Sequence, residues 1–75
     1  MPPKPERDVE KVYPKAALAA KLRRLADAVE NGKPFQIQID GERIRVPAGA
    51  VYNIEHERED NAEEIEFQIK WGNKP

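Results

Sequence analysis

The spacing of hydrophobic residues changes once along this chain, near residue 34. Before that point, apolar side chains recur at intervals of four, three and four residues, which is the spacing of one face of an α-helix. After it, apolar and polar residues alternate, which is the spacing of a β-strand with one buried face. The chain therefore predicts one helix followed by strands. The helical apolar positions are Leu18, Leu22, Leu25 and Val29, with Ala19 and Ala26 beside them.

Both ends of the helix carry typical boundary residues. Pro14 suits the first helical position, because the N–H that proline lacks would have no partner there. Gly32 after Asn31 supplies the left-handed residue that often ends a helix, and Pro34 cannot continue one. These signals predict a helix from Pro14 to Asn31.

The alternating part of the chain divides into two hairpins. The first, residues 35–47, turns at Asp40-Gly41, a pair that favours a two-residue turn. The second, residues 52–71, turns at a polar loop around Asp60-Asn61. We expect an α+β fold, with one amphipathic helix packed on an antiparallel four-stranded meander. A short strand at residues 8–13 would add at one edge of this sheet and give the order β-α-β-β-β-β.

A consistent register in this meander places three rows of side chains under the helix. The rows are Phe35, Val46, Tyr52 and Trp71; Ile37, Ile44, Ile54 and Ile69; and Ile39, Glu42, His56 and Phe67. On the outer face the same register sets Glu57 opposite Glu66, and Glu59 opposite Glu64. We expect a solvated charged face there, which discourages aggregation; in the alternative, the acidic strip docks a basic partner or loosely collects cations.

Composition limits the class of protein. The chain has 75 residues, enough for one domain, which we place at residues 8–71 between disordered tails at 1–7 and 72–75. It has no cysteine, so it holds neither a disulfide nor a thiolate metal site. Thirteen Lys and Arg against fourteen Asp and Glu argue against a dedicated nucleic-acid binder. No apolar run approaches the roughly eighteen residues that span a bilayer, and the start resembles no signal peptide, so we expect a cytoplasmic location.

Three segments of the sequence resemble the amphi-Trp domain family. They are LRRLADAVENG at residues 22–32, FQIQIDGERIRVP at 35–47 and EIEFQIKW at 64–71, so the resemblance covers roughly residues 9–71. Its distinctive position is Trp71, which closes the final alternating strand. The family has no assigned activity, and the resemblance therefore implies no catalytic or binding residue. Its members often start the helix with a serine or an acidic residue, where this chain has Pro14.

Candidate chemistry is sparse. His56 is the only histidine, and its one expected partner is Glu42, a cross-strand neighbour in the predicted meander. One histidine and one carboxylate are too few ligands for a closed metal site. The chain also has no cysteine, serine or threonine to serve as a nucleophile. We therefore expect no catalytic, cofactor-binding or metal-binding residue, no cofactor, and a protein that is not an enzyme.

The remaining hypotheses concern partners. The first is a non-catalytic protein-interaction module that acts through a sheet edge, through the acidic outer face at Glu57 and Glu66, or through Trp71, with a homodimer as one version. The second is weak nucleic-acid binding through the basic helix cluster. The third is an accessory subunit that completes the site of an enzyme. The basic helix cluster consists of Lys21, Arg23 and Arg24.

Overall fold

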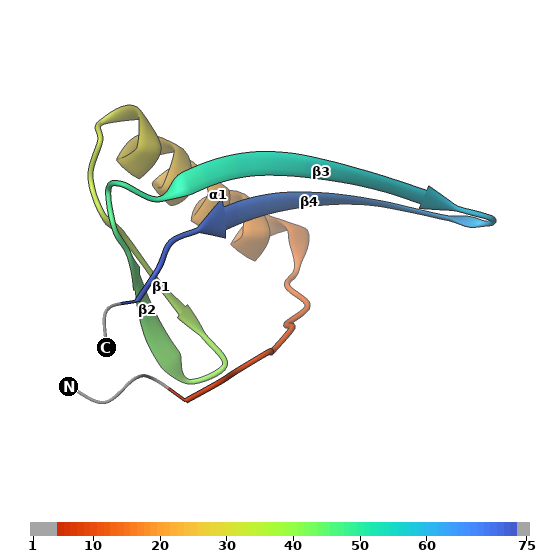
Figure 1. The fold of residues 1–75 in the computed structure, drawn as a ribbon, viewed down its shortest axis with the longest axis horizontal. Helices are drawn as coiled ribbons and strands as arrows, with labels where there is room; N and C mark the ends of the chain where they lie inside the picture. Colours follow the sequence, from red (N-terminus) through yellow and green to blue (C-terminus); the bar gives the residue numbers. More distant parts are fainter. Residues whose placement is uncertain (1–4, 74–75) are drawn as a thin grey trace.

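A computed structural model describes residues 5–73 and contains one helix and four antiparallel strands (Figure 1). The helix packs on the first strand, and the predicted α+β class is confirmed. The elements are α1 (Lys15–Glu30), β1 (Phe35–Ile39), β2 (Glu42–Val46), β3 (Val51–Glu59) and β4 (Ala62–Lys70).

The four strands form two separate sheets instead of one meander. β1 pairs only with β2, and β3 pairs only with β4. No strand of one hairpin has a Cα within 8 Å of a strand of the other, and the two hairpins point in different directions (Figure 1). The connection contains a turn in which the Ala50 N–H donates to the Pro47 carbonyl at 3.1 Å. This turn directs β3 away from β2, so the predicted pairing between the hairpins does not form.

Register is as predicted in the first hairpin and shifted in the second. β1 and β2 pair Phe35 with Val46 and Ile37 with Ile44, as the periodicity indicated. In the second hairpin Ile54 lies opposite Phe67, two positions from the predicted Ile69. The cause is the turn, which has only Asp60 and Asn61 between the strands, with Asp60 at φ 39°. A shift of two leaves every side chain on its predicted face.

Each end of α1 is closed by backbone groups. Pro14 was predicted to be the first helical residue, but the helix begins at Lys15 and Pro14 is its N-cap. The Pro14 carbonyl accepts from the Leu18 N–H at 3.0 Å. At the other end Gly32 has φ 62°, as predicted for a left-handed residue. The Gly32 N–H donates to the Val29 carbonyl at 3.2 Å, and the Lys33 N–H donates to Ala28 at 2.9 Å. This double closure is a Schellman motif.

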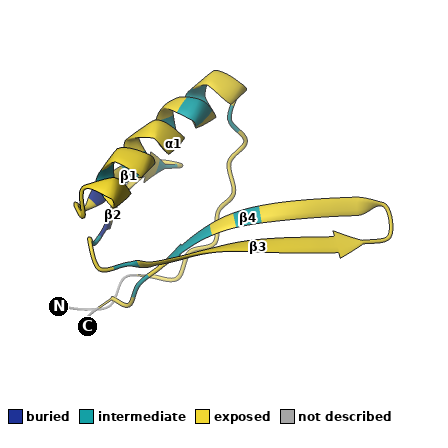
Figure 2. Ribbon diagram, turned by 90° about the horizontal axis from the view of Figure 1, so that it is seen from above, coloured by how far each residue is buried: buried dark blue, intermediate teal, exposed yellow. Residues whose placement is uncertain are grey.

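The core of the described residues is small. Only Phe35 and Val46 are buried, and both lie in the hairpin that α1 covers (Figure 2). Arg24 of α1 lies over the Phe35 ring at 5.3 Å from its centroid and donates to the Gln36 carbonyl at 3.1 Å. No residue of α1 is itself buried. The helix therefore packs on the first hairpin and not on the second. Its own apolar side chains are only partly covered by this hairpin.

The segment before the helix forms no strand. Residues 8–13 have no regular secondary structure, and Val12 is 91% exposed. The edge strand predicted there is absent, because the two valines do not alternate with a strand's period. Arg7 instead reaches the first hairpin: its guanidinium donates to the Ile39 carbonyl at 2.7 Å and lies 3.3 Å from Glu42. Of the predicted tails, residues 1–4 and 74–75 lie outside the described part.

The second hairpin, residues 51–70, projects from the rest of the chain and is called the arm below. The molecule measures 45 × 28 × 23 Å, with a radius of gyration of 14.2 Å; a compact domain of this length has about 11 Å. Figure 2 shows the arm separated from α1 along its length, and no Cα of an arm strand lies within 8 Å of a Cα of the helix. Among the described residues, no helix is long and apolar enough to cross a membrane.

Candidate interaction surface

The arm has one apolar and one acidic face, because strand residues point alternately to opposite sides. On one side, cross-strand pairs join Tyr52 to Ile69, Ile54 to Phe67 and His56 to Ile65. We call the five apolar members of this set the apolar arm face. On the other side lie Glu55, Glu57, Glu64 and Glu66, which we call the acidic arm face.

The apolar arm face is open to solvent. Phe67 is 67% exposed, Ile54 66% and Ile65 64%. The sequence placed Ile54 and Phe67 in the core, and that prediction is wrong, because neither α1 nor the first hairpin has a Cα within 8 Å of the arm strands. Full burial of a side chain of this size contributes about 1.5–3 kcal/mol. Contiguous exposed apolar groups with charged residues at their border are typical of interaction sites.

Like charges crowd the acidic arm face. Glu57 lies opposite Glu64 and Glu55 opposite Glu66, in place of the predicted pairing of Glu57 with Glu66. Carboxylate oxygens of Glu57, Glu64 and Glu66 all lie within 4.8 Å of one another. The pKa of Glu64 is raised because its protonated carboxyl group can donate a hydrogen bond to the Glu66 carboxylate and because Glu66 is negatively charged. The charges of Glu57 and Glu10 add to this effect. Repulsion among these carboxylates therefore destabilises the hairpin.

Two amide side chains partly offset this repulsion. Gln68 donates to Glu66 at 2.9 Å and to Glu55 at 3.0 Å, so one amide bridges two carboxylates. Asn53, the cross-strand partner of Gln68, donates to its side-chain oxygen at 2.8 Å. This chain of hydrogen bonds holds the root of the acidic arm face in one arrangement.

His56 pairs with Glu63 and not with the predicted Glu42. Its Nε2 lies 2.8 Å from a Glu63 oxygen that also accepts from Arg58 at 2.8 Å. The hydrogen bonds from Arg58 and His56 lower the pKa of Glu63. Glu42 belongs to the other sheet and pairs with Arg7 instead. The His56 group is thus an exposed ion pair at one end of the apolar arm face.

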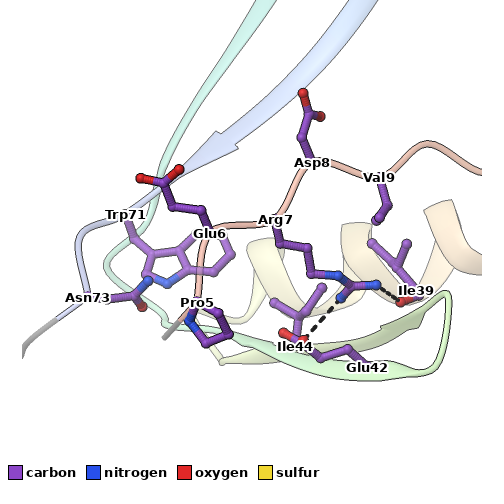
Figure 3. A pocket seen from close by; sticks show the side chains of 10 residues that line it. All are labelled: Pro5, Glu6, Arg7, Asp8, Val9, Ile39, Glu42, Ile44, Trp71 and Asn73. Carbon is purple, nitrogen blue, oxygen red and sulfur yellow. Dashed lines mark hydrogen bonds and ion pairs between the residues drawn. The ribbon is translucent and has the colours of Figure 1, made fainter. Parts of the chain in front are cut away.

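Trp71 follows the arm at its root and is half-buried. It lines an open hollow together with Ile44 of β2 and with Pro5 and Arg7 of the N-terminal segment (Figure 3). The predicted row that joined Trp71 to Phe35 and Val46 is not formed, because β4 does not lie beside the first hairpin. Trp71 instead lies where the arm, the first hairpin and the N-terminal segment converge.

The basic helix cluster is partly engaged by the fold. The Lys21 ammonium lies 4.9 Å from the centroid of the Tyr13 ring. Arg24 is held over Phe35, as described above. Arg23 is exposed. Two of the three cations thus lie over aromatic rings of their own chain, and nucleic-acid binding by this cluster stays a prediction.

Charge is divided unevenly between the arm and the rest of the chain. Residues 51–70 contain two Lys or Arg and seven Asp or Glu, a net charge of −5. The remaining residues contain eleven basic and seven acidic side chains, a net charge of +4. The overall charge of −1 therefore conceals an acidic arm on a basic body.

One signal in the sequence could have indicated the open arm, because the predicted second hairpin, residues 52–71, is longer than the first, residues 35–47. The strands of the first hairpin have five residues each and those of the second have nine. Pairing a nine-residue strand with a five-residue neighbour leaves an overhang that the neighbour cannot cover. The outer apolar pairs of the arm would extend beyond the first hairpin even in the predicted meander. Unequal strand length, and not periodicity, distinguished the two hairpins.

Comparisons with known proteins identify no relative for this chain. No family model, no curated protein and no solved structure matches it. Its function must therefore be inferred from the arm, its two faces and its charge.

Proposed function

We propose that this protein is a small, non-catalytic protein-interaction module that acts in the cytoplasm and binds its partner through the apolar arm face. The observation that carries the proposal is the exposure of Ile54, Ile65 and Phe67, each about two-thirds open to solvent. Removing such side chains from water is the main driving force of protein association. A partner that covers these three side chains gains the free energy of their burial, and the rest of the fold does not have to rearrange.

The sheet edges of the arm support the same proposal. β3 and β4 pair only with each other, so each has one edge whose backbone groups have no strand beside them. A strand of a partner can pair with such an edge while its side chains contact the apolar face. The acidic arm face limits this to selected partners, because negative charges beside an edge oppose unspecific strand pairing.

The resemblance to the amphi-Trp domain family is part of the proposal. The final strand β4 alternates in polarity and ends one residue before Trp71. In this proposal Trp71 fixes the root of the arm, and the alternating strand supplies the surface that binds.

Site-specific photo-crosslinking tests the proposed function. A photoreactive phenylalanine analogue replaces Phe67 on the apolar arm face, and a matched protein carries it at the adjacent Gln68 on the acidic arm face. After irradiation in living cells, we expect a protein adduct from position 67 and little from position 68. Adducts of equal yield at both positions, or none at either, would contradict binding through the apolar arm face.

A further inference from the structure

We propose that the partner is a second copy of this chain, in a two-fold dimer in which each arm lies across α1 of the other copy. This inference rests on the proposed function, because it names the occupant of the same apolar arm face. In such a dimer both copies use the same two surfaces, the arm of one and the helix of the other.

The first argument is surface area. The chain exposes 6843 Å², whereas a compact protein of 8.6 kDa exposes about 4,700 Å². The excess is about 2,100 Å² per copy. A stable interface of ordinary size removes about 800 Å² from each partner. This excess, to which the open arm and the extended N-terminal segment both contribute, is larger than the area that a stable dimer removes from each copy.

The second argument is that the chain has two apolar surfaces that its own fold leaves incompletely covered. On α1, Leu18, Leu22 and Val29 are between 44% and 46% exposed. The apolar arm face is exposed as well, and no Cα of the arm strands of the same chain lies within 8 Å of a Cα of α1. A reciprocal dimer covers both surfaces at once, and each copy then receives the helix cover that the sequence predicted for all four strands.

The third argument is charge. The arm carries −5 and the remainder of the chain +4, so the arm of one copy is attracted to the body of another. The basic helix cluster lies on the element that the arm would cross. Stacking arm against arm would instead bring two strongly acidic hairpins together. Charge therefore selects arm on helix over arm on arm, and the overall charge of −1 leaves whole copies free to associate.

The small core also favours a partner that is always present. Among residues 5–73 of the single chain only Phe35 and Val46 are buried, which is little for a domain that has neither a disulfide nor a thiolate metal site. A second copy is produced whenever the first is. Folding and association would then be coupled, and stability would rise with protein concentration.

Analytical ultracentrifugation of the full chain at micromolar concentration is the first test. The expected mass is twice 8.6 kDa. Lysine at the cross-strand pair Ile54 and Phe67 should give a monomer. The matched control places lysine at the neighbouring pair Asn53 and Gln68, with the same added charge on the opposite face, and should remain a dimer. A wild-type monomer at all accessible concentrations would overturn the proposal.

Isotope-filtered NMR on a mixed sample tests the arrangement without any substitution. Every leucine of the chain lies in α1, so labelling leucine methyl groups in half of the copies marks the helix alone. We expect contacts between these methyl groups and the Phe67 ring of unlabelled copies. A dimer that shows no contact between the leucine methyl groups and Phe67 would overturn the arm-on-helix arrangement. A monomer whose position 67 still crosslinks to a different protein would overturn the dimer and leave the proposed function standing.

Discussion

The two hairpins of this protein are built from the same local signals but end in different environments. Each has two antiparallel strands joined by two residues, and in each turn an aspartate has a positive φ, 47° at Asp40 and 39° at Asp60. The first hairpin lies under α1 and contains both residues that are buried in the described part of the chain. The second has strands almost twice as long and no cover. Alternating polarity and suitable turn residues are thus sufficient to form a hairpin. Burial of its apolar face depends on whether another element packs against it.

The largest contrast should come from one phenylalanine in each hairpin. Phe35→Ala removes a buried ring, which costs about 3–5 kcal/mol, as much as the whole stability of a domain of this size. We expect the variant to be largely unfolded by circular dichroism. Phe67→Ala should cost under about 1 kcal/mol within the single chain, because the ring is 67% exposed.

Protein concentration sharpens this contrast. If a second copy covers Phe67, urea midpoints of the wild type should rise with concentration, and those of Phe67→Ala should not. Equal loss of structure in both alanine variants, independent of concentration, would show that the arm is packed within its own chain.

A smaller effect should follow from loosening the cover of the first hairpin. Gly32→Ala places a side chain at φ 62°, which costs about 1–2 kcal/mol in the left-handed region. Hydrogen exchange should accelerate in α1 and the first hairpin and remain unchanged in the arm. Gly72→Ala is the matched control, because a Cβ there meets nothing within 4 Å and φ is not positive. Acceleration throughout the chain would mean that the two hairpins unfold together.

The stability of the arm should depend on pH through two carboxyl groups with opposite effects. The raised pKa of Glu64 means that the folded arm binds its proton more tightly, so arm stability falls as pH rises from the ordinary value of 4.5 through the raised pKa. The lowered pKa of Glu63 acts oppositely: its contribution is present above 4.5 and is lost as pH falls through the lowered pKa. Glu64→Gln should abolish the first dependence and Glu63→Gln the second, as measured by hydrogen exchange across this range. The opposite assignment would contradict the two pairings.

The smallest effect should come from the turns themselves. Glycine at Asp40 or Asp60 relieves the positive φ but adds freedom to the unfolded chain, so we expect a change of at most about 1 kcal/mol in either hairpin. The midpoint of thermal unfolding measures both. A large difference between the two variants would show that the turns, and not the cover, distinguish the hairpins.

Most of the local structure could be predicted from the sequence, and the missing parts are tertiary. The Pro14 and Gly32 signals gave the helix, and Asp40-Gly41 gave the register of the first hairpin, because these effects act within a few residues. The second register was wrong by two, since Asp60-Asn61 does not reveal whether the turn has two residues or four. The separation of the hairpins depends on the turn at Pro47 and on the unequal strand lengths. The alternation of apolar and polar residues predicts neither of these features. For the same reason Phe67, which lies on an exposed sheet face, was predicted to lie in the core.

The separation of charge between arm and body makes this small protein an electric dipole. With −5 at one end and +4 at the other, two copies that approach at random experience a torque before they touch, and the antiparallel orientation that results brings each arm toward the other body. Salt shortens the range of this torque to about 8 Å at physiological ionic strength. The rate of encounter should therefore fall with added salt, whereas the repulsion between two net charges of −1 would by itself make it rise.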